Sequence, residues 1–284
     1  MTFNDNAKID SSRTRRRGRT GGIVAGGGAV GVIALFLLSQ LLGVDLTGLA
    51  GGGGGGDGSD EAIANCETGA DANADRDCLI ASAGDSIDTY WAGQVTDYRP
   101  TNVVLFTDQA NTGCGGATSA VGPFYCPADE TIYIDTAFFD DLRSKYGSTG
   151  GPLAEMYVLA HEWGHHIQNI SGAMAGLDTQ TTGPDSDGVR LETQADCYAG
   201  AWAGEASTVP DDTGTPFLAE ITDAQLADAL SAAAAVGDDR IQESTTGQVN
   251  PESWTHGSAE QRQKWFTAGF EGGPSACDTF GGAL

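Results

Sequence analysis

The sequence has few basic residues. Lysine and arginine together number 14 against 39 aspartates and glutamates, which gives a formal net charge of −25. A chain this anionic repels a phosphate backbone, which argues against nucleic acid as a partner. The few basic residues are also unevenly placed, because six of the 14 fall within the first 19 positions. We therefore expect residues 1–21 to form a basic, solvated tail.

One long apolar stretch follows this tail. No charged residue occurs from Ile23 to Val44, and a helix of that length spans a bilayer. We expect a transmembrane signal anchor at residues 22–44, with the basic flank in the cytoplasm. A cleaved signal peptide is the alternative, but the run is long for a signal core and no small-residue cleavage site follows Leu42.

Glycine is concentrated just beyond this stretch, with six in a row from Gly51 to Gly56. Residues 45–60 are therefore expected to be a flexible linker. The remaining residues, 61–284, form one domain of ordinary size. With the anchor as described, the protein is a single-pass membrane protein whose domain is extracytoplasmic.

Cysteine is scarce, at six residues, and in an exported domain these are expected to form disulfides. Short spacing suggests two local pairs and leaves a third: Cys66 with Cys78, Cys114 with Cys126, and Cys197 with Cys277. Six cysteines allow 15 connectivities, so other pairings stay open.

Hydrophobic periodicity predicts an α+β domain with a small sheet. Residues 102–106 and 131–134 are β-branched runs bounded by turn residues, which is typical of strands. Helices are expected at 79–95, 136–146, 152–172 and 189–206. Two further helices start at capping-box signals: Thr222 with Gln225, and Ser258 with Gln261.

Histidine is rarer still, at four residues, and three of them lie within six positions. His161 and His165 are four apart, so on a helix both can present a ring nitrogen to one metal ion. Glu162 lies about 100° around that helix, where its carboxylate can act as general base on a metal-activated water. His166 points away from the ion and is expected to be structural.

A catalytic zinc ion needs a third protein ligand and an open position. Glu192 is the candidate, because it lies on the next expected helix. Asp196 shares its face at four-residue spacing and is expected to orient a ligand histidine as an outer carboxylate.

The sequence resembles the neutral zinc metallopeptidases of bacteria, the YpfJ-like group. The resemblance rests on Cys114-Gly115, Gly122 to Pro127, the HExxH segment His161 to Gln168, Leu191 to Gly200, and Thr255 to Ser258 with Arg262. It implies a zincin-like fold of the gluzincin type and supports Glu192 as third ligand and Asp196 as the accompanying acid. It implies no particular substrate.

These residues predict a membrane-anchored metalloendopeptidase with one Zn²⁺ ion, acting on protein or peptide substrates. A strand near the active-site helix, such as 131–135, could pair with an extended substrate. Two alternatives stay open. One is an envelope binding or scaffold module in which zinc is structural, and the other is a zinc amidase acting on non-peptide amides.

His256 is the remaining histidine and begins an expected helix. It could cap that helix, or it could face the zinc cleft and stabilise developing negative charge, with Arg262 nearby as a second cation. The segment from His256 to Arg262 resembles one in integral-membrane gluzincins, where a proline occupies the position of Gly257.

Overall fold

The computed structural model describes residues 2–18 and 60–284 of the chain, and within them it confirms the α+β class. The strands are β1 (Thr14–Arg17), β2 (Asp60–Ala62), β3 (Asn102–Phe106), β4 (Gln109–Thr112), β5 (Gly115–Thr118), β6 (Phe124–Cys126) and β7 (Thr131–Asp135). The α-helices are α2 (Gly69–Ala74), α3 (Arg76–Gln94), α4 (Phe138–Ser144), α5 (Pro152–Ser171), α6 (Asp187–Glu205), α7 (Asp223–Ala235), α8 (Asp238–Thr246) and α9 (Ala259–Gly272).

The strands form one mixed sheet in the order β2-β1-β3-β7-β6, and β4 and β5 form a separate hairpin. The inner strands β1, β3 and β7 are parallel, whereas the outer strands β2 and β6 are antiparallel to their neighbours. Successive side chains of a strand alternate between the two faces. Val103 and Leu105 of β3 accordingly join the main core with the helices, while Val104 and Phe106 join a smaller core with Ala110 of β4.

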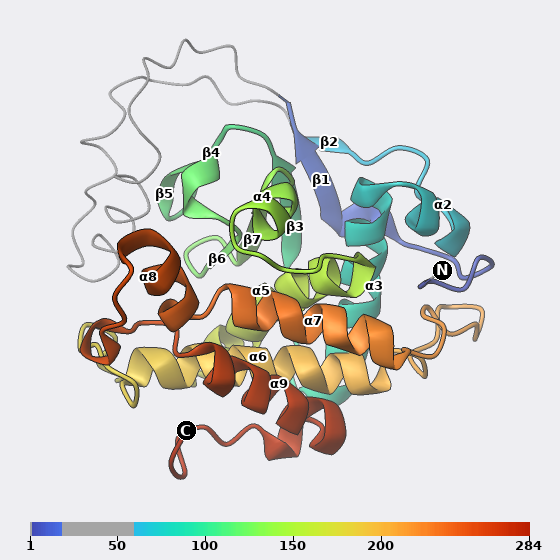
Figure 1. Cartoon of the computed structure of the whole chain (residues 1–284). Coiled ribbons are helices and arrows are strands. Elements are labelled where there is room, and N and C mark those ends of the chain that lie inside the picture. Colours follow the sequence, from blue (N-terminus) through green and yellow to red (C-terminus); the bar gives the residue numbers. More distant parts are fainter. Residues whose placement is uncertain (1, 19–59) are drawn as a thin grey trace.

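Helices α5, α6, α7 and α9 pack against one another on one side of the sheet (Figure 1). Helix α5 contacts strands β6 and β7 as well as helices α3, α6 and α7, so it lies in the middle of the molecule. Helix α6 lies between α5 and α9. This arrangement places the two helices that carry the predicted ligands next to each other.

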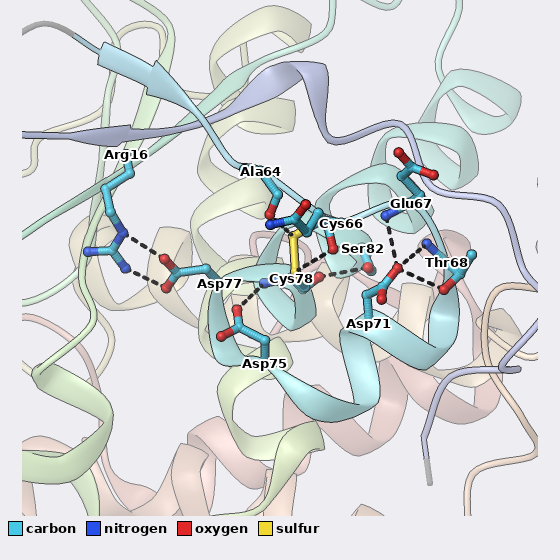
Figure 2. Close-up of a disulfide and its surroundings, with 11 residues drawn as sticks. Arg16, Ala64, Cys66, Glu67, Thr68, Asp71, Asp75, Asp77, Cys78 and Ser82 are labelled. Carbon is cyan, nitrogen blue, oxygen red and sulfur yellow. Dashed lines mark hydrogen bonds and ion pairs between the residues drawn. A yellow bond between two sulfur atoms is a disulfide. The ribbon is translucent and has the colours of Figure 1, made fainter.

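The prediction of a solvated basic tail at residues 1–21 is wrong for residues 2–18. Strand β1 is an inner strand of the sheet, between β2 and β3. Its basic residues pair with acids of the domain, Arg16 with Asp77 of α3 and Arg17 with Asp60 of β2. Figure 2 shows Arg16 hydrogen-bonded to Asp77, beside the Cys66–Cys78 disulfide near the start of α3. Local composition suggested a tail because these partners are distant in the sequence.

The prediction of a single-pass anchor at residues 22–44 is also wrong. That segment lies outside the described residues, and no helix within the described part is long and apolar enough to cross a membrane. Strands β1 and β2, which come before and after the segment, are hydrogen-bonded neighbours. One crossing would put them on opposite sides of a bilayer, which their pairing excludes. The predicted linker 45–60 also lies outside the described residues, except for Asp60 in β2.

Several local predictions are confirmed. Helix α5 begins with Pro152 and ends at Gly172, which adopts φ 76°. Both capping boxes form at the starts of α7 and α9. The cysteines pair as their spacing suggests and none is free: Cys66–Cys78, Cys114–Cys126 and Cys197–Cys277.

Asp85 of α3 makes the stability of this fold depend on pH. Burial, together with the nearby charges of Asp10, Asp88 and Asp212, raises the pKa of Asp85 to about 6, although the backbone N–H of Asp10 donates a hydrogen bond to it. The folded pKa lies above the ordinary value of 3.8. The protonated Asp85 carboxyl therefore contributes stability to the folded state. That contribution is fully present below the ordinary pKa and is lost as pH rises through about 6.

We expect Asp85→Asn to be more stable than the wild type at neutral pH by about 1–2 kcal/mol, after allowance for solvent screening. The asparagine keeps an oxygen for the Asp10 N–H and carries no charge. The advantage should disappear as pH falls toward 4 in thermal unfolding of both proteins. Asp223→Asn, at the exposed start of α7, controls for the loss of one charge. An advantage of Asp85→Asn that does not vary with pH would contradict this account.

Candidate metal centre

Helix α5 carries the two predicted histidine ligands in a buried environment. His161 and Glu162 are each only 7% exposed. Ionisable groups are buried at such a cost that they require partners. For His161, the partners Glu192 and Asp196 come from helix α6.

Gly164 allows α5 and α6 to approach closely. A Cβ atom at this position would lie 2.8 Å from Cα and 3.1 Å from Cβ of Ala195, closer than packed side chains tolerate. Glycine here removes that obstacle. The close approach brings the histidine pair of α5 and the acidic pair of α6 into one cluster.

His161, His165 and Glu192 converge at this crossing. Nε2 of His161 lies 3.2 Å from Oε2 of Glu192, and Nε2 of His165 lies 3.5 Å from Oε1 of the same carboxylate. One ligand atom of each residue lies within 4.8 Å of the other two. Two imidazoles and one carboxylate are the protein ligands of a common type of catalytic zinc site.

The other ring nitrogen of each histidine already has a hydrogen-bond acceptor. Nδ1 of His161 lies 2.9 Å from Oδ1 of Asp196, and Nδ1 of His165 lies 2.9 Å from Oε1 of Gln168. With a zinc ion bound, each Nδ1 would carry the proton and each Nε2 would offer its lone pair to the ion. The residues present thus fit a zinc ion.

Asp196 is fully buried, and Arg262 compensates its charge. Arg262 donates from Nε to Oδ2 at 2.8 Å and from Nη2 to Oδ1 at 3.0 Å. The hydroxyl of Tyr157 also donates to Oδ1, at 2.6 Å. The side chain of Arg262 is only 4% exposed, so it lies behind His161 and does not offer a second cation to a substrate.

The charges of this cluster shift the pKa values of its side chains. Burial disfavours the charged form of His161, but Asp196 and Glu192 outweigh it and raise the pKa of His161 to about 10. Burial also disfavours the Glu192 carboxylate. The charges of His165 and His256 and a hydrogen bond from His161 outweigh that effect and hold the pKa of Glu192 well below its usual range. A site that stabilises positive charge in this way also favours a divalent cation.

His256 lies on the loop before α9, and Asp238 holds that loop. Oδ2 of Asp238 accepts three successive backbone N–H groups, those of Thr255, His256 and Gly257, at 2.7–3.0 Å. Gly257 has φ 91°, which a proline ring cannot adopt. The backbone here therefore differs from the proline-containing segment of integral-membrane gluzincins.

The imidazole of His256 interacts electrostatically with Glu192 of the metal cluster. Burial disfavours its charged form, but Glu192 and Asp238 outweigh burial and raise the pKa of His256. Nδ1 lies 3.4 Å from Oδ1 of Asp238 and 2.9 Å from Oγ1 of Thr255. Nδ1 thus faces the loop.

His166 is fully buried outside the metal cluster. Its Nε2 lies 2.6 Å from the carbonyl oxygen of Arg99, and its Nδ1 lies 3.1 Å from the hydroxyl of Tyr125. The ring thereby connects α5 to strand β6, which contains Tyr125.

Sequence reasoning missed three residues of this centre. Tyr157 precedes His161 by four residues and Gln168 follows His165 by three, so both share a helix face with a ligand, and that spacing could have found them. Asp238 gives no such signal, because its partner loop lies 17–19 residues further along the chain.

Comparisons with known proteins agree with this geometry. The profile of the family described as "Putative neutral zinc metallopeptidase" matches residues 3–280. An uncharacterized protein of Mycobacterium tuberculosis (strain ATCC 25618 / H37Rv) is 49% identical over 290 residues, covering 100% of this chain and 99% of that protein. The uncharacterized protein YpfJ of Escherichia coli (strain K12) is 36% identical, with 95% of each chain covered. No solved structure gives a significant match. The chain therefore belongs to the neutral zinc metallopeptidase family.

Proposed function

We propose that the protein is a zinc-dependent endopeptidase with one ion held by His161, His165 and Glu192. The observation that carries the proposal is the convergence of these three side chains from two helices, with ligand atoms within 4.8 Å of one another. The presence of Glu162 favours a catalytic metal ion over a purely structural one. A structural site does not require a carboxylate that is not a ligand beside its first ligand.

The residues divide the work of hydrolysis. A bound zinc ion would polarise the scissile carbonyl and acidify water. Glu162 takes the proton of the attacking water and passes it to the amine nitrogen as the peptide bond breaks. Asp196 keeps the Nδ1 proton of His161 in place, and the charge of Arg262 keeps Asp196 ionised.

The substrate position proposed from sequence needs correction. Strand β7 pairs with β3 on one side and β6 on the other, so it has no free edge for a substrate. Strand β6 is the terminal strand of the described sheet. Its Tyr125 accepts a hydrogen bond of 2.9 Å from Asn169 of α5. An extended peptide added to β6 would therefore run along the active-site helix.

Metal analysis combined with digestion of a peptide library tests the function. The protein must retain residues 2–18, because a fragment starting at residue 61 would lack the inner strand β1. We expect about one zinc ion per chain, cleavage within peptides, loss of cleavage with a chelator and recovery with zinc. Zinc without any hydrolysis would favour the scaffold alternative.

A zinc amidase would leave the peptide library intact and would hydrolyse a non-peptide amide supplied as a second substrate. Amidases and deformylases with this helix usually recruit an upstream cysteine as a ligand. All six cysteines of this chain are in disulfides, which leaves none for that role. The endopeptidase is therefore the better supported of the two.

We expect His256→Ala to lower kcat by about 10²–10³, the usual effect of losing one donor to a developing oxyanion. Its zinc content and melting temperature should change little, because Asp238 holds the loop through backbone N–H groups that the substitution leaves in place. Asp238→Ala is the contrasting variant and should lower both stability and activity. Equal losses of stability and activity in His256→Ala would assign that residue a structural role.

We also propose that the folded domain works in an oxidising compartment outside the cytoplasm. Its three disulfides support this, since such bridges persist there and are rare in a reducing cytosol.

A further inference from the structure

A chain of hydrogen bonds leads from His165 to the C-terminal segment. Nδ1 of His165 lies 2.9 Å from Oε1 of Gln168. Nε2 of Gln168 donates to Oε1 of Gln194 at 3.2 Å, and Nε2 of Gln194 donates to the carbonyl oxygen of Cys277 at 3.0 Å. Gln168 is fully buried and Gln194 is 8% exposed, so water does not replace these partners.

Two backbone carbonyls fix which group donates and which accepts in this series of hydrogen bonds. Nε2 of Gln168 also donates to the carbonyl oxygen of Leu191 at 2.7 Å. A carbonyl can only accept, so Gln168 must turn its NH₂ group toward Leu191 and its oxygen toward His165. The carbonyl of Cys277 orients Gln194 in the same way. Nδ1 of His165 must therefore be the donor, so in the neutral imidazole the proton lies on Nδ1 and Nε2 is unprotonated.

The C-terminal segment that supplies the last carbonyl is itself fixed to α6. The Cys197–Cys277 disulfide joins them, and Oγ1 of Thr279 donates to the carbonyl oxygen of Arg190 at 2.8 Å. Arg190 donates in turn to the carbonyl oxygen of Gly282, also at 2.8 Å. Cys277 therefore cannot drift away from Gln194 without breaking covalent and polar contacts.

We propose that Gln168 is the positioning residue of His165, and that Gln194 and the disulfide-bound C-terminal segment hold Gln168 in its orientation. This inference rests on the proposed role of His165 as a metal ligand. Each histidine of the pair then has its own hydrogen-bond acceptor at Nδ1. His161 has the charged carboxylate of Asp196, and His165 has the neutral amide of Gln168. The support for His165 depends on residues after the last helix, far from the ligand motif in sequence.

The first test uses the metal-free protein, so it does not depend on zinc binding or activity. The ¹⁵N shifts of the neutral His165 imidazole are expected to show the proton on Nδ1 in the wild type. Gln168→Leu removes the acceptor at similar size and should shift the population toward the form with the proton on Nε2, facing Glu192. A wild type with the proton on Nε2, or an unchanged tautomer in Gln168→Leu, would overturn the proposal.

The second test measures zinc affinity by competition with a chelator. Gln168→Leu should bind zinc about 10- to 100-fold more weakly, as expected for loss of an outer partner. Gln194→Leu should cost less, since Leu191 still orients Gln168. Gln263→Leu is the matched control, because the amide of Gln263 also donates to a backbone carbonyl of a neighbouring helix, that of Leu230 on α7.

The two tests separate failure of the proposal from failure of the proposed function. If the wild type binds no zinc, the metal site is wrong, yet the tautomer measurement still decides whether Gln168 positions His165. If Gln168→Leu binds zinc as tightly as Gln263→Leu, the positioning role is wrong while the metal site stands. If Gln168→Leu does not fold, Gln194→Leu and the wild-type tautomer still decide the matter.

Discussion

Glu162→Gln is expected to lower the rate of peptide hydrolysis by about 10²–10⁴-fold while zinc content stays that of the wild type. Glutamine has nearly the same shape and can hydrogen-bond a water molecule, but it cannot take up a proton. Glu162 is not one of the three clustered ligands, so its substitution leaves the metal-binding set intact. The measurement is the cleavage rate of a reporter peptide alongside metal analysis of the same sample.

The control for this experiment is Glu260→Gln, at the exposed start of α9, which makes the same chemical change away from the site. It should retain wild-type turnover. Undiminished hydrolysis by Glu162→Gln would place the general base at another residue. Loss of zinc in that variant would instead make Glu162 part of the metal site.

His161→Ala and His165→Ala are each expected to weaken zinc binding by more than about 100-fold, because even an outer partner of a ligand contributes 10- to 100-fold. Either change leaves only two protein ligands. In His161→Ala, Asp196 keeps its bonds from Arg262 and Tyr157, so the surrounding helices should stay in place. Metal analysis after dialysis, with the melting temperature of the metal-free protein, measures both properties.

His166→Ala is the matched histidine control. That ring lies outside the metal cluster and bonds to Arg99 and Tyr125. Its loss should lower the melting temperature and leave zinc content unchanged. Full zinc occupancy in His161→Ala or His165→Ala would exclude that histidine as a ligand.

The sequence by itself determined the features that depend on neighbours within about one turn or one short loop. Histidines four apart share a helix face, and so do Glu192 and Asp196 at the same spacing. Capping boxes and the Pro152 start depend only on the first turn of a helix. Two of the disulfides close loops with a sequence separation of 12, which spacing alone suggests.

The tertiary structure decided the features whose partners are distant along the chain. Arg13, Arg16 and Arg17 suggest a solvated tail until the acids of α3 and β2 are placed beside them. Arg262 suggests a substrate contact until Asp196, 66 residues earlier, is found opposite it. Asp238 holds the His256 loop from α8, and the carbonyl of Cys277 orients Gln194 from the C-terminal segment. Both partners are also distant in the sequence from the helices that carry the metal ligands. Such partners are brought together by the packing of α5, α6 and α9, and periodicity within one segment carries no information about which helices will pack.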